Sequence, residues 1–101
     1  MDELTRVTAP TLDVLEHLLD ATDPTWGLLL VKATGRPAGT IYPILDRLER
    51  LGWVDSEWEV DDRPGPRRRL YTLTGEAVPV TRRLLEARRP ARPIAAREAR
   101  A

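Results

Sequence analysis

The sequence predicts a mostly α-helical fold with a small β-hairpin, an α+β class with the element order helix, helix, helix, strand, strand, helix. Two patterns carry this prediction. Apolar residues recur at helical spacing between residues 39 and 52, which indicates an amphipathic helix. Directly afterwards the period changes to two, which indicates a strand, and an arginine-rich turn leads to a second strand.

The composition indicates one globular domain. With 101 residues, 42% apolar and 32% charged, the chain can build a single modest core. Its longest aliphatic run, residues 28–31, is too short to span a bilayer, and residues 1–6 lack the apolar segment of a signal peptide. We therefore expect a cytoplasmic protein with no membrane partner. The chain has no cysteine, and His17 is its only histidine, so thiolate and histidine-rich metal sites are excluded and we expect no cofactor.

The charges are segregated although the net charge is zero. Residues 1–59 hold 5 basic and 11 acidic side chains, whereas residues 60–101 hold 11 basic and 5 acidic ones. This asymmetry is consistent with one basic binding edge. All cations except Lys32 are arginines, which suit bidentate phosphate and guanine contacts, although GC-rich coding produces the same bias.

The N-terminal part predicts a flexible end and then a helix. Residues 1–8 read as a flexible N-terminus, and a first helix is expected from about Ala9 to Ala21, with Thr8 or Thr11 as its N-cap. The apolar side of this helix is formed by Leu12, Leu15, Leu18 and Leu19.

A second helix is expected through residues 26–33. Asp23 and Pro24 predict its start, because Asp caps helices and Pro fits their first position. Gly35 predicts its end in a left-handed conformation. A third helix then begins near Pro37, and so short a connection makes the pair a helix-turn-helix whose later helix is the recognition candidate.

The third helix, residues 37–51, is amphipathic. Its apolar stripe consists of Ile41, Ile44, Leu45, Leu48 and Leu51. Its polar face carries Thr40, Tyr42, Pro43 and Arg47. Pro43 removes one amide donor and presses on the carbonyl of Gly39, where the absent side chain leaves room for adjustment. Ala38 and Gly39 keep the helix start slim, so that its free amides can approach a phosphate.

The remaining sequence predicts a hairpin and a last helix. One strand covers residues 54–60, residues 61–66 form the turn, and residues 68–74 return as the second strand. A fourth helix is expected over residues 76–89, followed by a flexible tail at residues 90–101. The order makes residues 9–75 a winged helix-turn-helix domain. Its three tryptophans follow apolar patterns and are expected in the core: Trp26, Trp53 and Trp58.

A helix with an open polar face beside a basic hairpin fits DNA, with the helix in the major groove and the hairpin on the backbone. The polar face could instead be only solvated, and Arg47 could pair with Asp46 or Glu49. The arginines around the turn are Arg63, Arg67, Arg68 and Arg69. Strand alternation prevents all four from pointing one way, so we expect Arg63 and Arg67 to face DNA. One of the other two should pair with an acidic residue of the neighbouring strand, Glu57 or Glu59.

These residues resemble the PadR-type transcriptional regulators. The resemblance is carried by T-G-R-P-A-G-T-I-Y-P-I-L-D-R-L-E-R-L-G-W-V and R-P-G-P-R-R-R-L-Y-T-L-T, and it covers residues 26–74. It implies a winged helix that binds double-stranded DNA as a homodimer, and a small aromatic effector, for which Trp26 and Trp58 are candidate contacts. The chain departs from the pattern at Pro37-Ala38, where many relatives have Ser, and at Gly75, where relatives often have Pro.

The sequence thus predicts a sequence-specific DNA-binding repressor that acts as a homodimer. The expected DNA-binding residues are Ala38, Gly39, Thr40, Tyr42, Pro43, Arg47, Arg63, Arg67 and Arg68. The expected dimer contacts, on the first and fourth helices, are Leu12, Leu15, Val80, Leu84 and Leu85. The alternative is a winged helix that binds another protein and does not read DNA, which zero net charge favours slightly. An enzyme is the weakest hypothesis, because no nucleophile, base or phosphate loop stands out.

Overall fold

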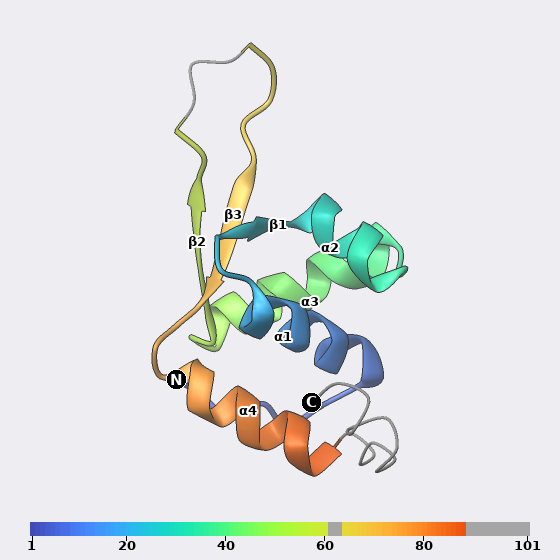
Figure 1. The fold of residues 1–101 in the computed structure, drawn as a ribbon, viewed down its shortest axis with the longest axis vertical. Coiled ribbons are helices and arrows are strands. Elements are labelled where there is room, and N and C mark those ends of the chain that lie inside the picture. Colours follow the sequence, from blue (N-terminus) through green and yellow to red (C-terminus); the bar gives the residue numbers. More distant parts are fainter. Residues whose placement is uncertain (61–63, 89–101) are drawn as a thin grey trace, which may run out of the picture.

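The computed structural model describes residues 1–60 and 64–88 and shows the predicted α+β winged helix (Figure 1). Its elements are α1 (Ala9–Asp20), β1 (Thr25–Trp26), α2 (Gly27–Thr34), α3 (Ala38–Arg50), β2 (Val54–Trp58), β3 (Arg69–Leu73) and α4 (Ala77–Arg88). The hairpin of β2 and β3 extends away from the helices as the wing, which we define as residues 54–60 and 64–73. The predicted tail, residues 90–101, lies outside the described residues.

The first helix begins where the sequence predicts. Thr8 is its N-cap, and its side-chain oxygen accepts a hydrogen bond from the backbone amide of Thr11 at 3.3 Å. This bond satisfies one of the amides that have no partner within the first helical turn. Thr8, rather than Thr11, is therefore the cap.

The start of the second helix differs from the prediction. Asp23 and Pro24 precede a short extended segment, Thr25 and Trp26, and α2 begins only at Gly27. The extended pair forms a third strand on the sheet, antiparallel to β3, so the strand order is β1-β3-β2. The physical reason is that ladder hydrogen bonds with β3 compete with helix formation at these two residues.

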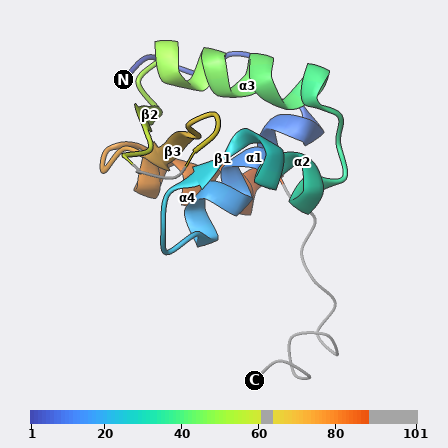
Figure 2. The same cartoon turned by 90° about the horizontal axis from the view of Figure 1, so that it is seen from above.

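The turn between α2 and α3 has the conformation that the sequence predicts. Gly35 has a φ of 71° and closes α2 in the left-handed region, as predicted. The next residue, Arg36, donates to a carboxylate oxygen of Asp13 on α1 at 2.7 Å. This ion pair ties the turn to the first helix and so fixes the angle at which α3 leaves it. Figure 2 shows α3 along one side of the molecule, with α2 at one end and the wing root at the other.

One core connects the three N-terminal helices with the wing root and the start of α4. Its buried residues are Leu4, Val14, Leu15, Leu18, Leu30, Ile41, Ile44, Leu45, Leu48, Trp53, Val54, Tyr71, Leu73 and Ala77. The apolar stripe predicted for the third helix is buried as expected, apart from Leu51, which is half-buried.

The N-terminal residues belong to this core, which corrects the expectation of a flexible end. Leu4 is buried, and the backbone amide of Asp2 donates to the carbonyl of Leu51 at 2.8 Å. The indole nitrogen of Trp53 donates to the carbonyl of Asp2 at 2.7 Å. Trp53 therefore lies in the core as predicted and holds residues 1–4 there.

The other two tryptophans were predicted in the core, and the structure places them elsewhere. Trp58, at the outer end of β2, is 56% exposed, and Trp26 is half-buried. The pairing of β2 with β3 runs from Val54 opposite Leu73 to Trp58 opposite Arg69, so the strand leaves the core as it rises. Alternation with period two therefore buries a side chain only near the wing root.

Candidate nucleic-acid interface

The open face of α3 has the composition predicted for it. Ala38, Gly39, Tyr42 and Pro43 are exposed, and Thr40 is half-buried. No side chain caps the start of this helix, since its N-cap residue is a proline. A side chain added to Gly39 would meet open space, so a large group such as a nucleic-acid backbone can approach the helix start closely.

Tyr42 is held in place by Gly27 of α2. A carbon atom added as Cβ of Gly27 would lie 2.6 Å from the hydroxyl oxygen of Tyr42 and in overlap with its ring. The ring therefore rests directly on the glycine backbone, and 42% of Tyr42 stays exposed. This contact orients the tyrosine on the polar face of the recognition helix.

Arg47 lies half-buried further along α3. The two carboxylates that could have paired with it have other partners. Asp46 pairs with Arg50 at 3.3 Å, and Glu49 pairs with Arg69 at 3.4 Å. Among the described residues, no ion pair therefore diverts Arg47 from a ligand.

The wing arginines differ in how strongly they are engaged. Arg67 is exposed and has no ion pair with a described residue. Arg68 pairs with Glu59 at 3.8 Å, and its guanidinium carbon lies 4.4 Å from the centre of the Trp26 ring. Arg63 lies outside the described residues.

Arg69 is the most internal of the described wing arginines. Besides Glu49, it contacts the ring of Trp58, with 5.1 Å between the guanidinium carbon and the ring centre. The sequence predicted that one of Arg68 and Arg69 would pair internally, and both do. The second pair was missed because Glu49 lies on α3, which strand alternation does not reveal.

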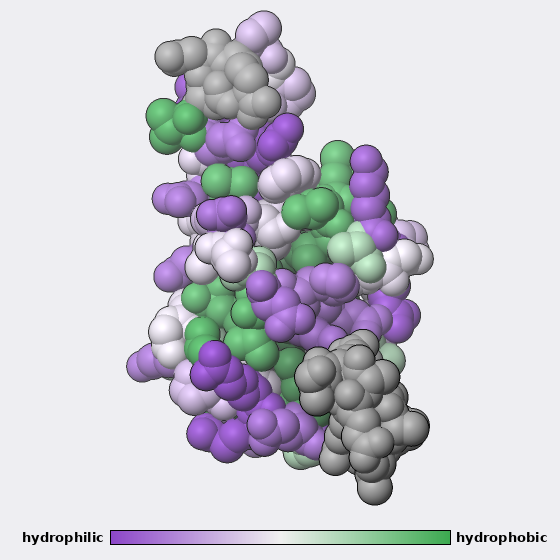
Figure 3. All heavy atoms as spheres, viewed as in Figure 1, coloured by the Kyte–Doolittle hydropathy of each residue, from purple (hydrophilic) through white to green (hydrophobic). Residues whose placement is uncertain are grey.

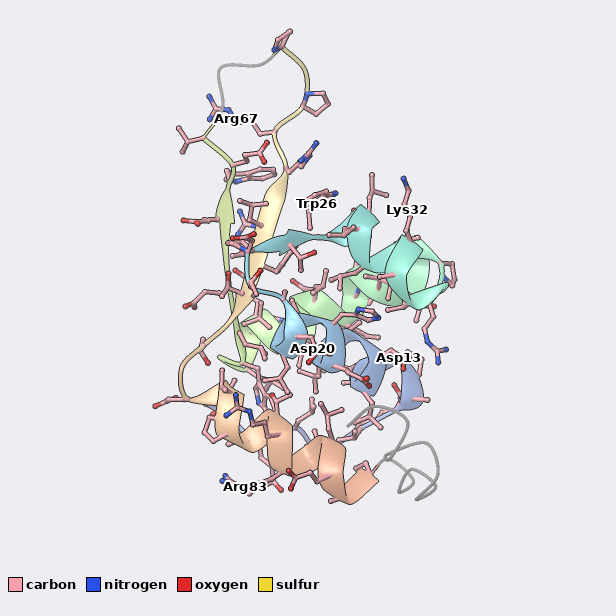
Figure 4. The ribbon with its side chains drawn as sticks, in the orientation of Figure 1. Asp13, Asp20, Trp26, Lys32, Arg67 and Arg83 are labelled. Carbon is pink, nitrogen blue, oxygen red and sulfur yellow. The ribbon has the colours of Figure 1, made fainter. Side chains whose placement is uncertain are left out.

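A hollow of about 430 Å³ separates the wing from α2 and α3, and we call it the wing hollow. Its lining residues are Trp26, Gly27, Leu28, Tyr42, Trp58, Pro66, Arg67, Arg68 and Arg69. Tyr42 of the recognition helix and Arg67 of the wing therefore border one concave surface. Figure 4 shows Trp26 on the side of the wing that faces α2, with Arg67 further out.

The rim of the hollow includes exposed apolar surface. Leu28 is 59% exposed at the start of α2, and the exposed Trp58 lines the same hollow. In Figure 3, apolar side chains are visible between the wing and α2, next to polar ones along the wing. A surface that joins guanidinium groups with flat and aliphatic side chains suits a sugar-phosphate backbone, which has both charged and apolar parts.

Beneath the hollow, polar side chains connect α3 with both strands of the wing. Glu49 accepts a hydrogen bond from Ser56 of β2 and pairs with Arg69 of β3. Burial raises the pKa of the Tyr71 hydroxyl above its usual value of 10.0, and the nearby Glu49 carboxylate adds to this effect, while Arg69 opposes it. These contacts fix the orientation of the wing relative to the recognition helix.

The expected dimer contacts fall into two groups. Leu15 is fully buried and Leu12 is 8% exposed, so α1 offers neither to a second chain, which corrects that prediction. Leu15 belongs to the core of its own chain, and Leu12 is buried outside that cluster. Val80, Leu84 and Leu85 of α4 are half-buried and keep accessible surface.

Sequence reasoning named Arg69 but not its pair with Glu49, and it did not assign Gly27 or Leu28 to this site. Gly27 could have been recognised only from its packing on Tyr42, which has no sequence signal. The exposed residues Leu28 and Leu29 belong to an aliphatic run that would be expected in the core from the sequence alone.

Within residues 1–60 and 64–88 there is no cluster of three or more potential metal ligands, and no helix is long and apolar enough to cross a bilayer.

Comparison with known proteins agrees with this geometry. A family model described as the transcriptional regulator PadR-like family matches residues 14–77. A solved PadR family transcriptional regulator from Eggerthella lenta is 34% identical, with a TM-score of 0.62 over 76% of this chain and 69% of that one. A PadR-like transcription factor from Bacteroides fragilis is 26% identical, with a TM-score of 0.62 over 76% of this chain and 77% of that one.

A third solved structure, a PadR family transcription regulator from Clostridium difficile, is similar in fold alone. It is 19% identical, with a TM-score of 0.64 over 79% of this chain and 90% of that one. No curated protein matches the chain.

Proposed function

The chain belongs to the PadR-like family of transcriptional regulators, and on that premise we propose that it is a homodimeric repressor that binds DNA through α3 and the wing. The family consists of DNA-binding regulators, not enzymes. The observation that supports the proposed binding mode is the wing hollow, because Tyr42 and Arg67 border it together. Such a regulator would act in the cytoplasm, as the sequence predicts.

In this mode the start of α3 enters the major groove. Ala38 and Gly39 allow close approach, Thr40 and Tyr42 contact phosphates or base edges, and Pro43 borders the same face. Arg47 would reach DNA from a position further along the helix.

The wing then contacts the sugar-phosphate backbone next to the groove that α3 enters. Arg67 is the exposed phosphate contact, and Arg68 joins it from the inner side of the hollow. Arg63, at the turn, is proposed as a further phosphate contact on sequence grounds alone.

A dimer is proposed because one winged helix buries little surface on DNA, and two copies are needed for useful specificity. The apolar surface of α4, formed by Val80, Leu84 and Leu85, is the proposed contact. Sedimentation at micromolar concentration tests this: we expect a dimer, and a monomer would contradict it. Leu85→Glu should shift the protein toward the monomer, whereas Arg83→Glu, an exposed site on the same helix, serves as the matched control.

For the flat aromatic effector that the family resemblance implies, we propose the wing hollow as the binding site. Trp26, Tyr42 and Trp58 provide ring surfaces there. A ligand in this position would exclude DNA from the same surface, so it would act as an inducer. Competition between a candidate ligand and labelled DNA, followed together with tryptophan fluorescence, tests this.

The proposed function is tested by titrating DNA fragments from upstream of its own gene at several salt concentrations. Arg67→Ala should weaken binding to all sequences alike and reduce the logarithmic salt slope by about 0.9. Tyr42→Ala should lose more affinity for the selected site than for random DNA. If no fragment shows salt-sensitive binding, the protein-interaction alternative is favoured instead.

A further inference from the structure

The dipeptide Trp26-Gly27 lies between the two elements of the proposed DNA surface. Trp26 ends β1, which pairs with β3 through Thr25 opposite Tyr71 and Trp26 opposite Leu70. Gly27 is the first residue of α2. The start of the second helix is therefore fixed by its pairing with β3 of the wing, and no connection of this kind was evident from the sequence.

On the wing side, Trp26 supports Arg68. The guanidinium lies over the indole ring at 4.4 Å and pairs with Glu59 at 3.8 Å, while 42% of the arginine side chain stays exposed. Stacking engages the flat face of the guanidinium and leaves its N–H edge available for hydrogen bonds. A stacked arginine also loses less conformational freedom when it binds a phosphate.

On the side of the recognition helix, Gly27 supports Tyr42. The tyrosine ring occupies the space that any larger residue at position 27 would fill. The overlap concerns the far end of an exposed side chain, so a substitution at Gly27 would displace the tyrosine without breaking the core.

We propose that Trp26 and Gly27 are positioning residues for DNA binding, which hold Arg68 and Tyr42 in place in the lining of the wing hollow. Neither residue needs to touch DNA: Trp26 acts through Arg68, and Gly27 acts through Tyr42. Arg68 exchanges Glu59 for a phosphate when DNA enters the hollow. The inference rests on the proposed function.

The first test is a double-mutant cycle on DNA affinity with Trp26→Leu and Arg68→Ala. Because Trp26 acts through the arginine, each single variant should weaken binding by about tenfold and reduce the salt slope by about 0.9. The double variant should bind no more weakly than Arg68→Ala alone. Trp26→Tyr, which keeps a ring, should restore most of the affinity and the full salt slope.

The matched control is Trp58→Leu. Trp58 also stacks on a wing arginine, but on Arg69, which pairs with Glu49 inside the protein. Its effect should add to that of Arg68→Ala and leave the salt slope unchanged. Additive effects of Trp26→Leu and Arg68→Ala, or an equal loss of slope in Trp58→Leu, would overturn the inference for Trp26.

The second test uses Gly27→Ala. We expect DNA affinity to fall as far as in Tyr42→Ala, while the urea midpoint changes little, and we expect no further loss in the double variant. A Gly27→Ala variant that binds DNA normally overturns the inference for Gly27. Gly75→Ala is the control for glycine replacement away from the DNA surface, because its added carbon also meets open space and its φ is not positive.

The outcomes separate the two proposals. A wild-type protein that binds no DNA contradicts the proposed function itself. A wild-type protein that binds DNA, with Trp26→Leu and Arg68→Ala acting independently, contradicts only the positioning role. Arg68→Lys tests the stacked contact without any change at Trp26: lysine keeps the charge but lacks the flat guanidinium, so affinity should fall severalfold.

Discussion

Burial of the single side chain Tyr71 links the stability of the protein to pH. It is 8% exposed on β3, and burial is the main cause of its raised pKa. A raised folded-state pKa means that ionisation is harder in the folded protein than in the unfolded one. The resulting stability is complete below about pH 10 and is lost as the pH rises through the folded-state pKa.

We therefore predict that the free energy of unfolding falls above pH 10 and that Tyr71→Phe removes part of this fall. Urea unfolding at pH 8 and at pH 11 measures it. Tyr42→Phe should remove a smaller part of it, because the nearby Tyr42 hydroxyl is only a minor cause of the raised pKa of Tyr71. An identical alkaline loss in Tyr71→Phe would show that other groups cause it.

For single residues, the sequence predicts burial and backbone conformation well where these depend only on the helix or strand that contains the residue. The buried stripe of α3 and the left-handed Gly35 follow from helical spacing and backbone sterics. Trp58 and Arg69 do not, because their surroundings depend on how far the wing rises from the core and on which helix lies behind it. Such contacts between distant segments leave no periodic signal.

At the scale of elements, α4 contains an unsatisfied polar atom. The hydroxyl of Thr81 is fully buried and has no hydrogen-bond partner among the described residues. Thr81→Val keeps the shape and removes the cost of burying that hydroxyl, so we predict a gain of about 1 kcal/mol in the free energy of unfolding.

Thr74 is the matched control for this prediction. Its hydroxyl donates to the carbonyl of Gly52 at 3.1 Å and accepts from the amide of Ala77 at 3.3 Å, at the start of α4. Thr74→Val should therefore lose about 1 kcal/mol. Urea midpoints compare the two variants, and destabilisation by Thr81→Val would indicate a bond that the hydroxyl makes after all.

The sequence predicts which helices and strands form better than it predicts the residue at which each one begins. The helix-turn-helix, the hairpin and the last helix follow from period and turn residues, and the order confirms the predicted fold class. The predicted start of α2 was wrong because β1 owes its extended form to its pairing with β3, whose partner residues lie 44 and 46 positions later in the chain. The N-terminal residues were wrongly expected to be flexible. Their place in the structure depends on Trp53, which is distant in the sequence and donates a hydrogen bond to the carbonyl of Asp2, while Leu4 is buried in the core.

The wing, α2 and α3 border the wing hollow, and a second copy of the chain would double this surface. If α4 joins two copies, the two recognition helices should read half-sites about one helical turn apart, or a multiple of that distance. Selection of bound fragments from genomic DNA should therefore return a pseudo-palindromic site. Inserting about 5 base pairs between the halves should abolish tight binding, because it turns one half to the opposite face. Unchanged affinity would contradict a dimer on DNA.

In the proposed complex, the start of α3 and the wing meet the same stretch of duplex together. The chain has no cysteine, so a single cysteine can carry an iron chelate that cleaves nearby DNA. Ala38→Cys places it at the start of α3, and Pro66→Cys places it on the wing; both positions are exposed. The account predicts cleavage from the two positions within one half-site, in the major groove and on the adjoining backbone. Cleavage from only one position, or at sites more than about one helical turn apart (~34 Å), would contradict it.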